Sequence, residues 1–293
     1  MPQDAAASKS VFIVGNQTFE VPFRPPWVMG VVNVTPDSFS DGGEYLDRDH
    51  AVARALQQIE QGARIIDIGA ESTRPGSLSV SAKEQRRRAV PVIEALRAKE
   101  SVIPISIDTC SAEVANAAIK SGANMVNDTS ALRDDEGMAD VVADSGASLI
   151  LMHRKGTPRD MQQGGGPEYN DVIAEISDFL TQRLDFAIRR GIDRARIAID
   201  PGIGFGKRTA DNLTILNQAR RFTELGCPVV IGASRKRLIG ELLNIAEPCD
   251  RMIGSVACAT IAAISGASII RAHDVMETVQ ALQVVHAVLG NRS

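Results

Sequence analysis

The stretch "DRDHAVARALQQIEQGARIIDIGA" (residues 47–70) holds a helix, a turn and a strand in that order. Over residues 47–61, four apolar side chains recur at helical spacing and share one face: Ala51, Ala55, Leu56 and Ile59. Gly62 follows, and glycine readily takes the left-handed conformation that ends a helix. The next run, "RIIDIGA", is nearly all apolar, which is typical of a parallel strand covered on both faces. The stretch therefore predicts one helix–strand unit of an α/β fold.

The same pattern recurs along the chain. Eight short apolar runs predict strands at residues 28–34, 64–70, 103–108, 124–128, 148–153, 196–200, 228–234 and 267–274. Amphipathic stretches of helical length lie between them, for example at residues 171–190. Glycines stand where a helix would end just before the next strand, at Gly62, Gly122, Gly146, Gly191 and Gly266. Eight alternating units predict a (β/α)₈ (TIM) barrel, with a doubly wound open sheet as the alternative.

The N-terminal region precedes the first predicted barrel unit. Residues 11–22, "VFIVGNQTFEVP", place Gly15 and Asn16 between two β-rich runs, which predicts a hairpin. We expect this β-hairpin to be a flap that closes the bottom of the barrel. Residues 1–10 are polar and rich in Ala and Ser, which predicts a disordered tail. Residues 11–293 are expected to form a single domain, although their number would also allow two ordinary ones.

Composition narrows the class of protein. The 293 residues are 44% hydrophobic but only 4% aromatic, which favours helices packed on buried strands over a β-sandwich. The formal net charge of −4 argues against sequence-independent binding of nucleic acid. No run of 18 apolar residues and no signal-peptide pattern occurs, so we expect no membrane contact. No cysteines form a C-x-x-C pair, which predicts reduced, mostly buried thiols in a cytoplasmic protein: Cys110, Cys227, Cys249 and Cys258.

Polar residues stand at the end of every predicted strand, and in a (β/α)₈ barrel this is the catalytic face. They are Asn33, Asp67, Asp108, Asn127 with Asp128, His153, Asp200, Ser234 with Lys236, and Arg271 with His273. Any one of them could be polar only because strand ends approach solvent, but eight in succession indicate a site. The mixture of carboxylates, amides and cations predicts a pocket for a neutral polar heterocycle on one side and an anion on the other.

The glycine-rich run "GIGFGK" (202–207) follows the sixth predicted strand. It does not fit the phosphate-binding pattern G-x-x-x-x-G-K-[ST], because only three residues separate its first and third glycines and arginine follows its lysine. We expect instead that these glycines bring the backbone close to a flat ligand, with Phe205 and Met152 as apolar walls.

Eight motifs, in chain order, carry a family resemblance: "NVTPDSFSDGG", "ESTRPG", "SIDT", "NDTS", "LMH..GTPR.MQ", "DPGIGFGK", "GASRK" and "RAHDV". Together they closely resemble the dihydropteroate synthase family of folate biosynthesis, over residues 27–290. The resemblance implies a (β/α)₈ barrel and a transferase that uses Mg²⁺. Its substrates would be 6-hydroxymethyl-7,8-dihydropterin diphosphate and 4-aminobenzoate, and its products 7,8-dihydropteroate and pyrophosphate.

The resemblance also implies roles for particular residues. The pterin would be held by Asp108, Asn127, Asp200 and Lys236, with Met152 and Phe205 along its faces. The diphosphate would be held by Asn33, Arg271 and His273, with Asn33 also a Mg²⁺ ligand. A first mobile loop with Asp37 and Phe39, and a second with Thr73, Arg74 and Pro75, would close around 4-aminobenzoate beside Ser234 and Lys236. The implied catalytic set is Asp108, Asp200, Lys236, Arg271 and His273.

The residue types suit this chemistry. A carboxylate can accept hydrogen bonds from adjacent N–H groups of a pterin, and an amide can both donate and accept. Cations and Mg²⁺ belong where a diphosphate leaves with its negative charge. Because an aryl amine is already neutral near pH 7, no strong base is needed. The ring nitrogens of the dihydropterin can stabilise a cation at the departing methylene, so we expect an S_N1-like path in which pyrophosphate leaves first. We also expect sulfonamides, as mimics of 4-aminobenzoate, to compete.

Several residues stay outside this assignment. Asp67 and Asp128 are interpreted as structural, with Asp67 as an anchor for the second loop. Arg154-Lys155 departs from the family pattern and could aid diphosphate capture or lie on the surface. Arg237 also departs, and it could place the 4-aminobenzoate carboxylate near a basic helix start. The apolar run "GSVACATIAAISGA" (254–267) could support a homodimer or be a buried barrel helix.

Two other functions remain open. A pterin-binding methyltransferase, which passes a methyl group from methyltetrahydrofolate to a corrinoid protein, would share the pterin-binding Asp and Asn. It needs neither a diphosphate site nor the "TPDSFSDGG" and "STRPG" loops. A catalytically silent paralogue that binds pterin or a partner protein would be expected to lack site residues that are present here.

Overall fold

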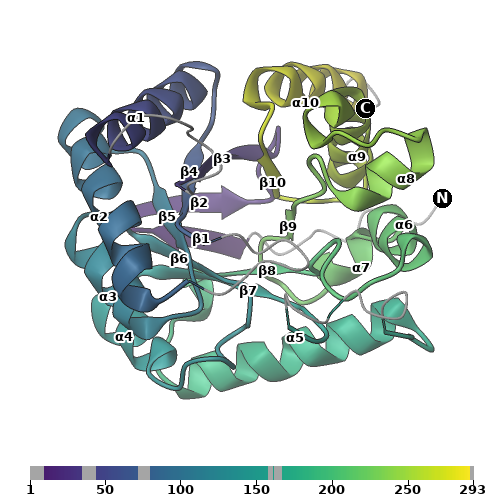
Figure 1. The fold of residues 1–293 in the computed structure, drawn as a ribbon. Coiled ribbons are helices and arrows are strands. Elements are labelled where there is room, and N and C mark those ends of the chain that lie inside the picture. The colour runs from purple at the N-terminus through teal and green to yellow at the C-terminus, as the bar shows by residue number, and fades with distance from the viewer. Residues whose placement is uncertain (1–9, 35–43, 72–79, 158–160, 162–166, 291–293) are drawn as a thin grey trace.

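The structure, a computed structural model, describes residues 10–34, 44–71, 80–157, 161 and 167–290. Eight parallel strands form its centre (Figure 1). Their order in the sheet is β8-β7-β6-β5-β4-β3-β10-β9. The bounds are β3 (Trp27–Asn33), β4 (Ile65–Gly69), β5 (Ile105–Asp108), β6 (Met125–Asp128), β7 (Ser148–Met152), β8 (Ile197–Asp200), β9 (Val230–Ile231) and β10 (Ile269–Ala272).

The sheet closes on itself through its two end strands. Ile199 of β8 forms a parallel bridge with Val229, the residue before β9. The Ile199 amide donates to the Pro228 carbonyl at 2.9 Å. β9 is therefore short, but it completes the ring of strands. The predicted (β/α)₈ barrel is confirmed, and the doubly wound open sheet is ruled out.

Helices cover the outside of the barrel (Figure 1). They are α1 (Glu44–Glu60), α2 (Ala82–Lys99), α3 (Ala112–Lys120), α4 (Met138–Ser145), α5 (Val172–Arg189), α6 (Thr209–Asn217), α7 (Arg220–Thr223), α8 (Arg237–Leu243), α9 (Met252–Ile264) and α10 (Val275–Gly290), with 3-10 helices η3 (Arg194–Arg196) and η4 (Pro248–Arg251). Their apolar faces pack on the outward side chains of the strands in one buried core. On α1, Ala51 and Ala55 are fully buried in this core, while Leu56 and Ile59 pack against it, as the helical spacing predicts.

Left-handed glycines mark the five predicted helix ends. All five have positive φ angles, from 65° at Gly146 to 111° at Gly122. A residue with a Cβ is disfavoured in that conformation, so glycine ends each helix and turns the chain into the next strand.

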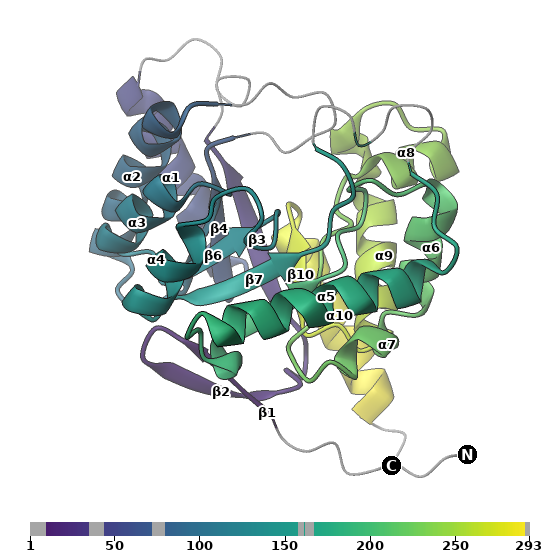
Figure 2. The same ribbon diagram turned by 90° about the horizontal axis from the view of Figure 1, so that it is seen from below.

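The antiparallel hairpin of β1 (Ser10–Val14) and β2 (Gln17–Val21) lies across one end of the barrel (Figure 2). Its Phe12 and Val14 pack against the lowest inward side chains of the barrel. We call these barrel residues the floor cluster: Met29, Ile65, Met125, Ile150, Ala198, Val230 and Ile269. The hairpin is also tied to the barrel, because the Ser148 hydroxyl donates to the Ile13 carbonyl at 2.6 Å. The predicted flap is thus confirmed, and it closes the amino-terminal end of the strands.

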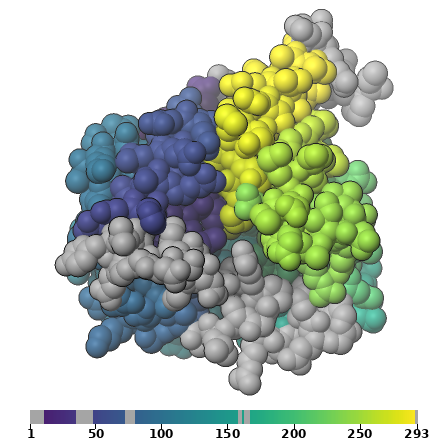
Figure 3. All heavy atoms as spheres, turned by 45° about the horizontal axis from the view of Figure 1, so that its top comes forward, coloured from purple at the N-terminus to yellow at the C-terminus, as the bar shows by residue number. Residues whose placement is uncertain are grey.

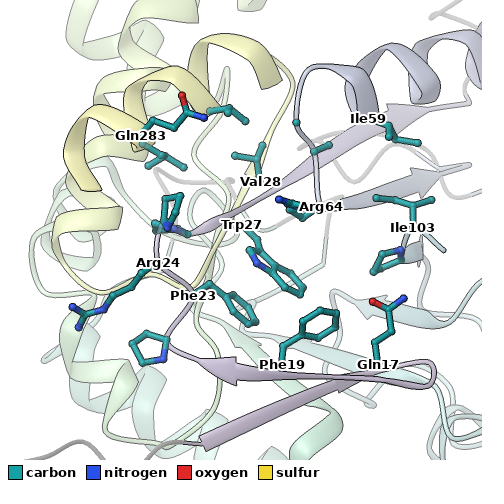
Figure 4. A pocket seen from close by; sticks show the side chains of 18 of the residues that line it. Gln17, Phe19, Phe23, Arg24, Trp27, Val28, Ile59, Arg64, Ile103 and Gln283 are labelled. Atoms are coloured by element: carbon teal, nitrogen blue, oxygen red, sulfur yellow. The ribbon is translucent and has the colours of Figure 1, made fainter. Parts of the chain in front are cut away.

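Aromatic rings fill the junction between the hairpin and the barrel (Figure 4). Phe23 stacks on Trp27 with ring centroids 3.9 Å apart, and Phe19 meets the same indole edge-on at 4.5 Å. A hollow of about 820 Å³ lies beside them, with Arg64 and Gln283 among its lining residues. It lies at the amino-terminal end of the strands, whereas barrel enzymes bind substrate at the carboxyl end.

Two expectations need correction. Ser10, which we assigned to a disordered tail, begins β1, and residues 1–9 lie outside the described part of the chain. The four cysteines are free thiols, but they are not mostly buried, because Cys249 is exposed and Cys110 is half-buried. Within the described residues, no helix combines the length and the apolar character needed to cross a membrane.

Candidate active site

The side chains inside the barrel form layers, because inward-facing residues of a strand are two positions apart. The lowest layer is the apolar floor cluster. Two residues further along the same chain segments stand Val31, Asp67, Asn127, Met152, Asp200, Gly232 and Arg271, of which four are polar or charged. The barrel interior therefore changes from apolar to largely polar within one step towards the carboxyl ends of the strands. The site is built on this second layer.

Arg271 links two carboxylates in the polar layer. Its Nε donates to Asp67 Oδ2 at 2.7 Å, and its Nη2 donates to Asp108 Oδ2 at 3.0 Å. Asn127 Nδ2 donates to the same Asp67 oxygen at 3.2 Å. This network thus joins four side chains that are far apart in the sequence. They come from four strands, β4, β5, β6 and β10.

Sequence reasoning missed the role of Asp67. We interpreted it as an anchor for the second loop, but its carboxylate is fully buried inside the barrel, where it bonds two residues of the predicted site. Glu71 ties that region instead, because its carboxylate accepts from the Val80 amide at 2.8 Å. The signal was present in the sequence, since Asp67 follows Ile65 by two residues and so shares its inward direction.

Burial and neighbouring charges shift the pKa values of the ionisable groups in this network. Desolvation and the Asp67 carboxylate raise the pKa of Asp108 to about 7, although Arg271 opposes the shift. Burial alone would lower the pKa of Arg271, but Asp67 and Asp108 outweigh it and raise that pKa. Within the described residues, four buried side-chain oxygens have no hydrogen-bond partner, and three of them belong to β4 and β5: Asp67 Oδ1, Asp108 Oδ1 and Ser106 Oγ. Unpartnered buried atoms of this kind are typical of a ligand site.

Asp200 and Lys236 form a second polar group. Asp200 Oδ1 accepts from the Gly202 amide at 2.6 Å, and burial raises the pKa of its carboxyl while Lys236 opposes the shift. Lys236 donates to the Ile203 carbonyl, and its Nζ lies 4.6 Å from the centre of the Phe205 ring. Burial lowers the pKa of Lys236 to about 8, with Asp200 opposing. A carboxylate, an amine and an aromatic face are therefore held close together.

The glycine-rich run after β8 packs against the loop after β7. A Cβ at Gly202 would lie 1.9 Å from the His153 carbonyl oxygen, and a Cβ at Gly206 would lie 2.0 Å from the Lys155 carbonyl oxygen. These two glycines allow neighbouring backbones to touch. The expected approach of this run to a flat ligand stays a prediction.

Lys207 stabilises the same contact, and no sequence pattern identified it. Its side chain is only 2% exposed, with Nζ 2.9 Å from His153 Nδ1 and 3.1 Å from the Phe205 carbonyl. Burial lowers the pKa of Lys207 well below its ordinary value. Burial, reinforced by Lys207, also lowers the pKa of His153 to about 2, so this imidazole is neutral. Lysine is rarely buried to this degree, which is why its type alone predicts a surface position.

Ser234 and His273 meet at the ends of β9 and β10. The Ser234 hydroxyl lies 3.0 Å from His273 Nδ1, and it accepts from the His273 amide at 3.2 Å. The next residue, Arg235, has a φ of +59° and pairs with the buried carboxylate of Asp274. That ion pair holds the turn that presents Ser234 and Lys236 to the centre of the barrel face.

Asn33 lies at the end of β3 beside Asp108. Its amide oxygen is 3.5 Å, and the Asp108 Cβ is 3.8 Å, from the Cβ position of Gly69. Five predicted loop residues lie outside the described part of the chain: Asp37, Phe39, Thr73, Arg74 and Pro75. In the part that is described, no cluster of three or more His, Cys, Asp or Glu side chains is arranged to hold a metal ion.

The charged residues that depart from the family pattern form ion pairs with nearby carboxylates. Arg154 is not a surface charge, because it is buried and its Nη2 binds both oxygens of Asp134 at 2.7 and 2.5 Å. Lys155 lies 3.5 Å from Glu175. Arg237 is 69% exposed and pairs with Glu241 one helical turn away, at 2.5 Å. The proposed contact of Arg237 with 4-aminobenzoate stays a prediction.

Known proteins are similar to this chain in sequence and in fold. Residues 29–273 match the family described as pterin binding enzyme. Over 265 residues the chain is 44% identical to the dihydropteroate synthase of Escherichia coli (strain K12), which covers 90% of this chain and 92% of that one. The chain belongs to the dihydropteroate synthase family. It is therefore a transferase of folate synthesis, as the motifs predict.

Solved dihydropteroate synthases have the same fold. The Xanthomonas albilineans enzyme with 4-aminobenzoic acid is 46% identical, with a TM-score of 0.88 over 96% of this chain and 99% of that one. The Yersinia pestis enzyme in complex with a sulfonamide drug is 40% identical, with a TM-score of 0.88 over 96% of this chain and 100% of that one.

Proposed function

We propose that the chain joins 6-hydroxymethyl-7,8-dihydropterin diphosphate to 4-aminobenzoate, which gives 7,8-dihydropteroate and pyrophosphate. The polar layer above the floor cluster carries this proposal, because it combines acceptors for N–H groups with cations for an anion. Membership of the dihydropteroate synthase family supports the same reaction.

The pterin is proposed to bind in the polar layer. Its adjacent N–H groups would donate to the Asp200 carboxylate, beside which Lys236 offers a donor for a ring nitrogen or carbonyl. Asp108 and Asn127 would accept or donate at the opposite ring edge. Met152 and Phe205 would contact its faces. The floor cluster below excludes water from this edge of the ring.

The diphosphate is proposed to lie towards the rim. The C–O bond to the pterin methylene breaks, and the electron pair leaves with pyrophosphate. His273 and Arg271 would hold the departing negative charge. Arg271 binds Asp67 through Nε and Asp108 through Nη2, so its Nη1 takes part in neither of these bonds. The Asp108 carboxylate would stabilise the positive charge left on the pterin. The lone pair of the aryl amine then forms the C–N bond, and its nitrogen gives up a proton.

Mg²⁺ fits the oxygen donors at this rim. The ion favours amide, carboxylate and phosphate oxygens together with water. The Asn33 amide oxygen and the Asp108 side chain border the same point above Gly69, and Asp108 Oδ1 is buried without a partner among the described residues. Asn33 would hold the ion together with the diphosphate, and bound Mg²⁺ would neutralise charge on the leaving group.

The second substrate is proposed to bind beside Ser234 and Lys236. The Xanthomonas albilineans structure with 4-aminobenzoic acid and the Yersinia pestis structure with a sulfonamide support a shared pocket for both molecules. Sulfonamides would then compete with 4-aminobenzoate here. The loop residues Asp37, Phe39, Thr73, Arg74 and Pro75 are proposed to complete this pocket.

A homodimer through α9 and α10 is also proposed, in the cytoplasm. These helices pack side by side, and the C-terminal third of the chain forms a broad surface (Figure 3, green to yellow). Each helix buries one face and exposes large apolar side chains on the other: Ile253, Ile261, Ile264, Val284 and Val288. Exposed apolar surface of this kind is typical of a protein interface.

Product formation tests the proposed reaction. The purified chain should convert the two substrates to 7,8-dihydropteroate, detected by chromatography, and it should lose this activity when Mg²⁺ is chelated. Asp200→Ala should abolish product. Product that still forms from a pterin without the diphosphate would contradict the mechanism.

A further inference from the structure

Asp67 is a charged side chain that is fully buried and that the proposed mechanism does not use. A single oxygen, Oδ2, accepts both from Arg271 Nε at 2.7 Å and from Asn127 Nδ2 at 3.2 Å. Both donors belong to residues proposed to contact the substrate. Asp67 stands behind them on β4, directly above Ile65 of the floor cluster.

The carboxylate decides which way the Asn127 amide faces. A carboxylate paired with Arg271 can only accept hydrogen bonds, so Asn127 must turn its NH₂ group towards Asp67. The amide oxygen is then directed away from Asp67. With its orientation fixed, Asn127 presents a defined acceptor to an N–H group of the pterin instead of an amide that can rotate by 180°.

The same carboxylate fixes the plane of the Arg271 guanidinium. One bond at Nε to Asp67 and one at Nη2 to Asp108 hold the planar group at two points. Without Asp67, the guanidinium would keep only the Asp108 bond and could turn towards that residue. Arg271 would then no longer be shared with Asp67 and would neutralise the charge of Asp108 more completely. Less of the Asp108 charge would be available to the substrate.

We propose that Asp67 is a positioning residue of the pterin site, which acts by setting the orientation of the Asn127 amide and of the Arg271 guanidinium. This inference rests on the proposed pterin site. It assigns to Asp67 an effect on pterin affinity that is separate from its effect on folding.

Asp67→Asn tests the proposal, because it keeps the shape of the side chain but removes the charge and adds a donor. The Kd for 6-hydroxymethylpterin, measured by titration calorimetry, should rise about tenfold or more through loss of a charge-assisted hydrogen bond. The KM for 4-aminobenzoate should stay within about twofold, since that substrate lies elsewhere in the proposed site.

Asp128→Asn is the matched control. Asp128 is equally buried, but its carboxylate faces the Ser130 and Leu132 amides, at 2.8 and 2.7 Å. This variant should lower the Tm and leave the pterin Kd unchanged. An equal rise in Kd for Asp128→Asn and Asp67→Asn would overturn the proposal, since loss of any buried carboxylate would then explain it.

A double-mutant cycle separates positioning from structure. In an Asn127→Ala background, Asp67→Asn should weaken pterin binding clearly less than in the wild type, because the amide to be oriented is gone. Equal effects in both backgrounds, or an unchanged Kd in Asp67→Asn, would overturn the inference. If Asp67→Asn does not fold, Asp67→Glu keeps the charge and should bind pterin with altered Kd but unaltered stoichiometry; an unaltered Kd there would also overturn it. A wild-type protein that binds no pterin would instead overturn the proposed function itself.

Discussion

Burial in the site brings the pKa values of two ionisable groups, Asp108 and Lys236, close to neutral pH. Desolvation, with the help of Asp67, raises the pKa of Asp108 to about 7 and leaves it a carboxylate only above that pH. Desolvation also lowers the pKa of Lys236 to about 8, so its positive charge is lost above that pH. The free protein therefore has both charges together only in a narrow range of pH.

This arrangement predicts a bell-shaped pH profile. The kcat/KM for the pterin diphosphate should be greatest between about pH 7 and pH 8 and fall about tenfold per unit on either side, if both charges act on the substrate. The lower limb reports protonation of Asp108, and the upper limb reports deprotonation of Lys236. Steady-state kinetics from about pH 5.5 to 9.5 measures it.

Two variants test which residue causes each limb of the pH profile. Lys236→Arg keeps its charge at high pH, so the upper limb should move upwards or disappear. Asp108→Asn cannot ionise, so the lower limb should disappear along with most activity. A profile that is flat in the wild type, or limbs that stay in place in these variants, would contradict the assignment.

Residue types predicted the site only where polar side chains stand at strand ends. Asn127, Asp200 and Arg271 were found in this way, and the structure brings Asn127 and Arg271 together through Asp67. Asp67 itself required the inward register of β4, which depends on counting from Ile65. Lys207 could not be predicted, because its buried partner His153 lies 54 residues away in the chain.

At the scale of elements, the chain just after β7 packs against the glycine-rich run after β8 at the carboxyl ends of these strands. Gly202 lets the two backbones touch, and the Lys207 amine bridges the same loops. Gly202 is therefore constrained twice, by its positive φ of +72° and by the carbonyl oxygen 1.9 Å from its Cβ position. Gly146 has a similar φ of +65°, but its Cβ position is open.

Gly202→Ala should destabilise the fold by about 3 kcal/mol or more, since it adds a backbone clash to the strain of positive φ. Gly146→Ala, the matched control, should lower the free energy of unfolding by only about 1 kcal/mol. Urea denaturation of both variants measures the difference. Equal losses in the two would show that the contact with His153 is unimportant.

Helices, strands and their glycine boundaries could be predicted because they depend on local patterns. The periodic apolar faces of α1 and α5 and the left-handed glycines needed only neighbouring residues. The extents were less certain, since β9 is only Val230–Ile231 where residues 228–234 were predicted. Its length is set by how the barrel closes against β8, which is a contact through space.

At the scale of the whole molecule, the barrel separates stability from chemistry. The hairpin and the floor cluster close one end with apolar packing, and the polar layer opens towards the other. The exposed apolar faces of α9 and α10 belong to neither end. They are the part of the surface for which a second copy of the chain is the proposed partner.

The dimer can be tested by its mass in solution. Light scattering should give twice the 31.3 kDa of one chain. Ile253→Glu should yield a monomer, because Ile253 is 78% exposed on α9 and its burial in an interface would be lost. Val102→Glu, at a similarly exposed apolar residue between β5 and α2, should remain dimeric. A monomeric wild type, or a dimeric Ile253→Glu, would contradict the proposed interface.

Binding of the pterin diphosphate tests most directly whether the polar layer is the substrate site. Titration calorimetry of the intact protein with 6-hydroxymethyl-7,8-dihydropterin diphosphate and Mg²⁺, without 4-aminobenzoate, should show one site per chain. In Asp200→Asn, affinity should fall about tenfold or more while the Tm stays close to that of the wild type. An Asp200→Asn protein that is folded and binds this ligand as tightly as the wild type would contradict the account.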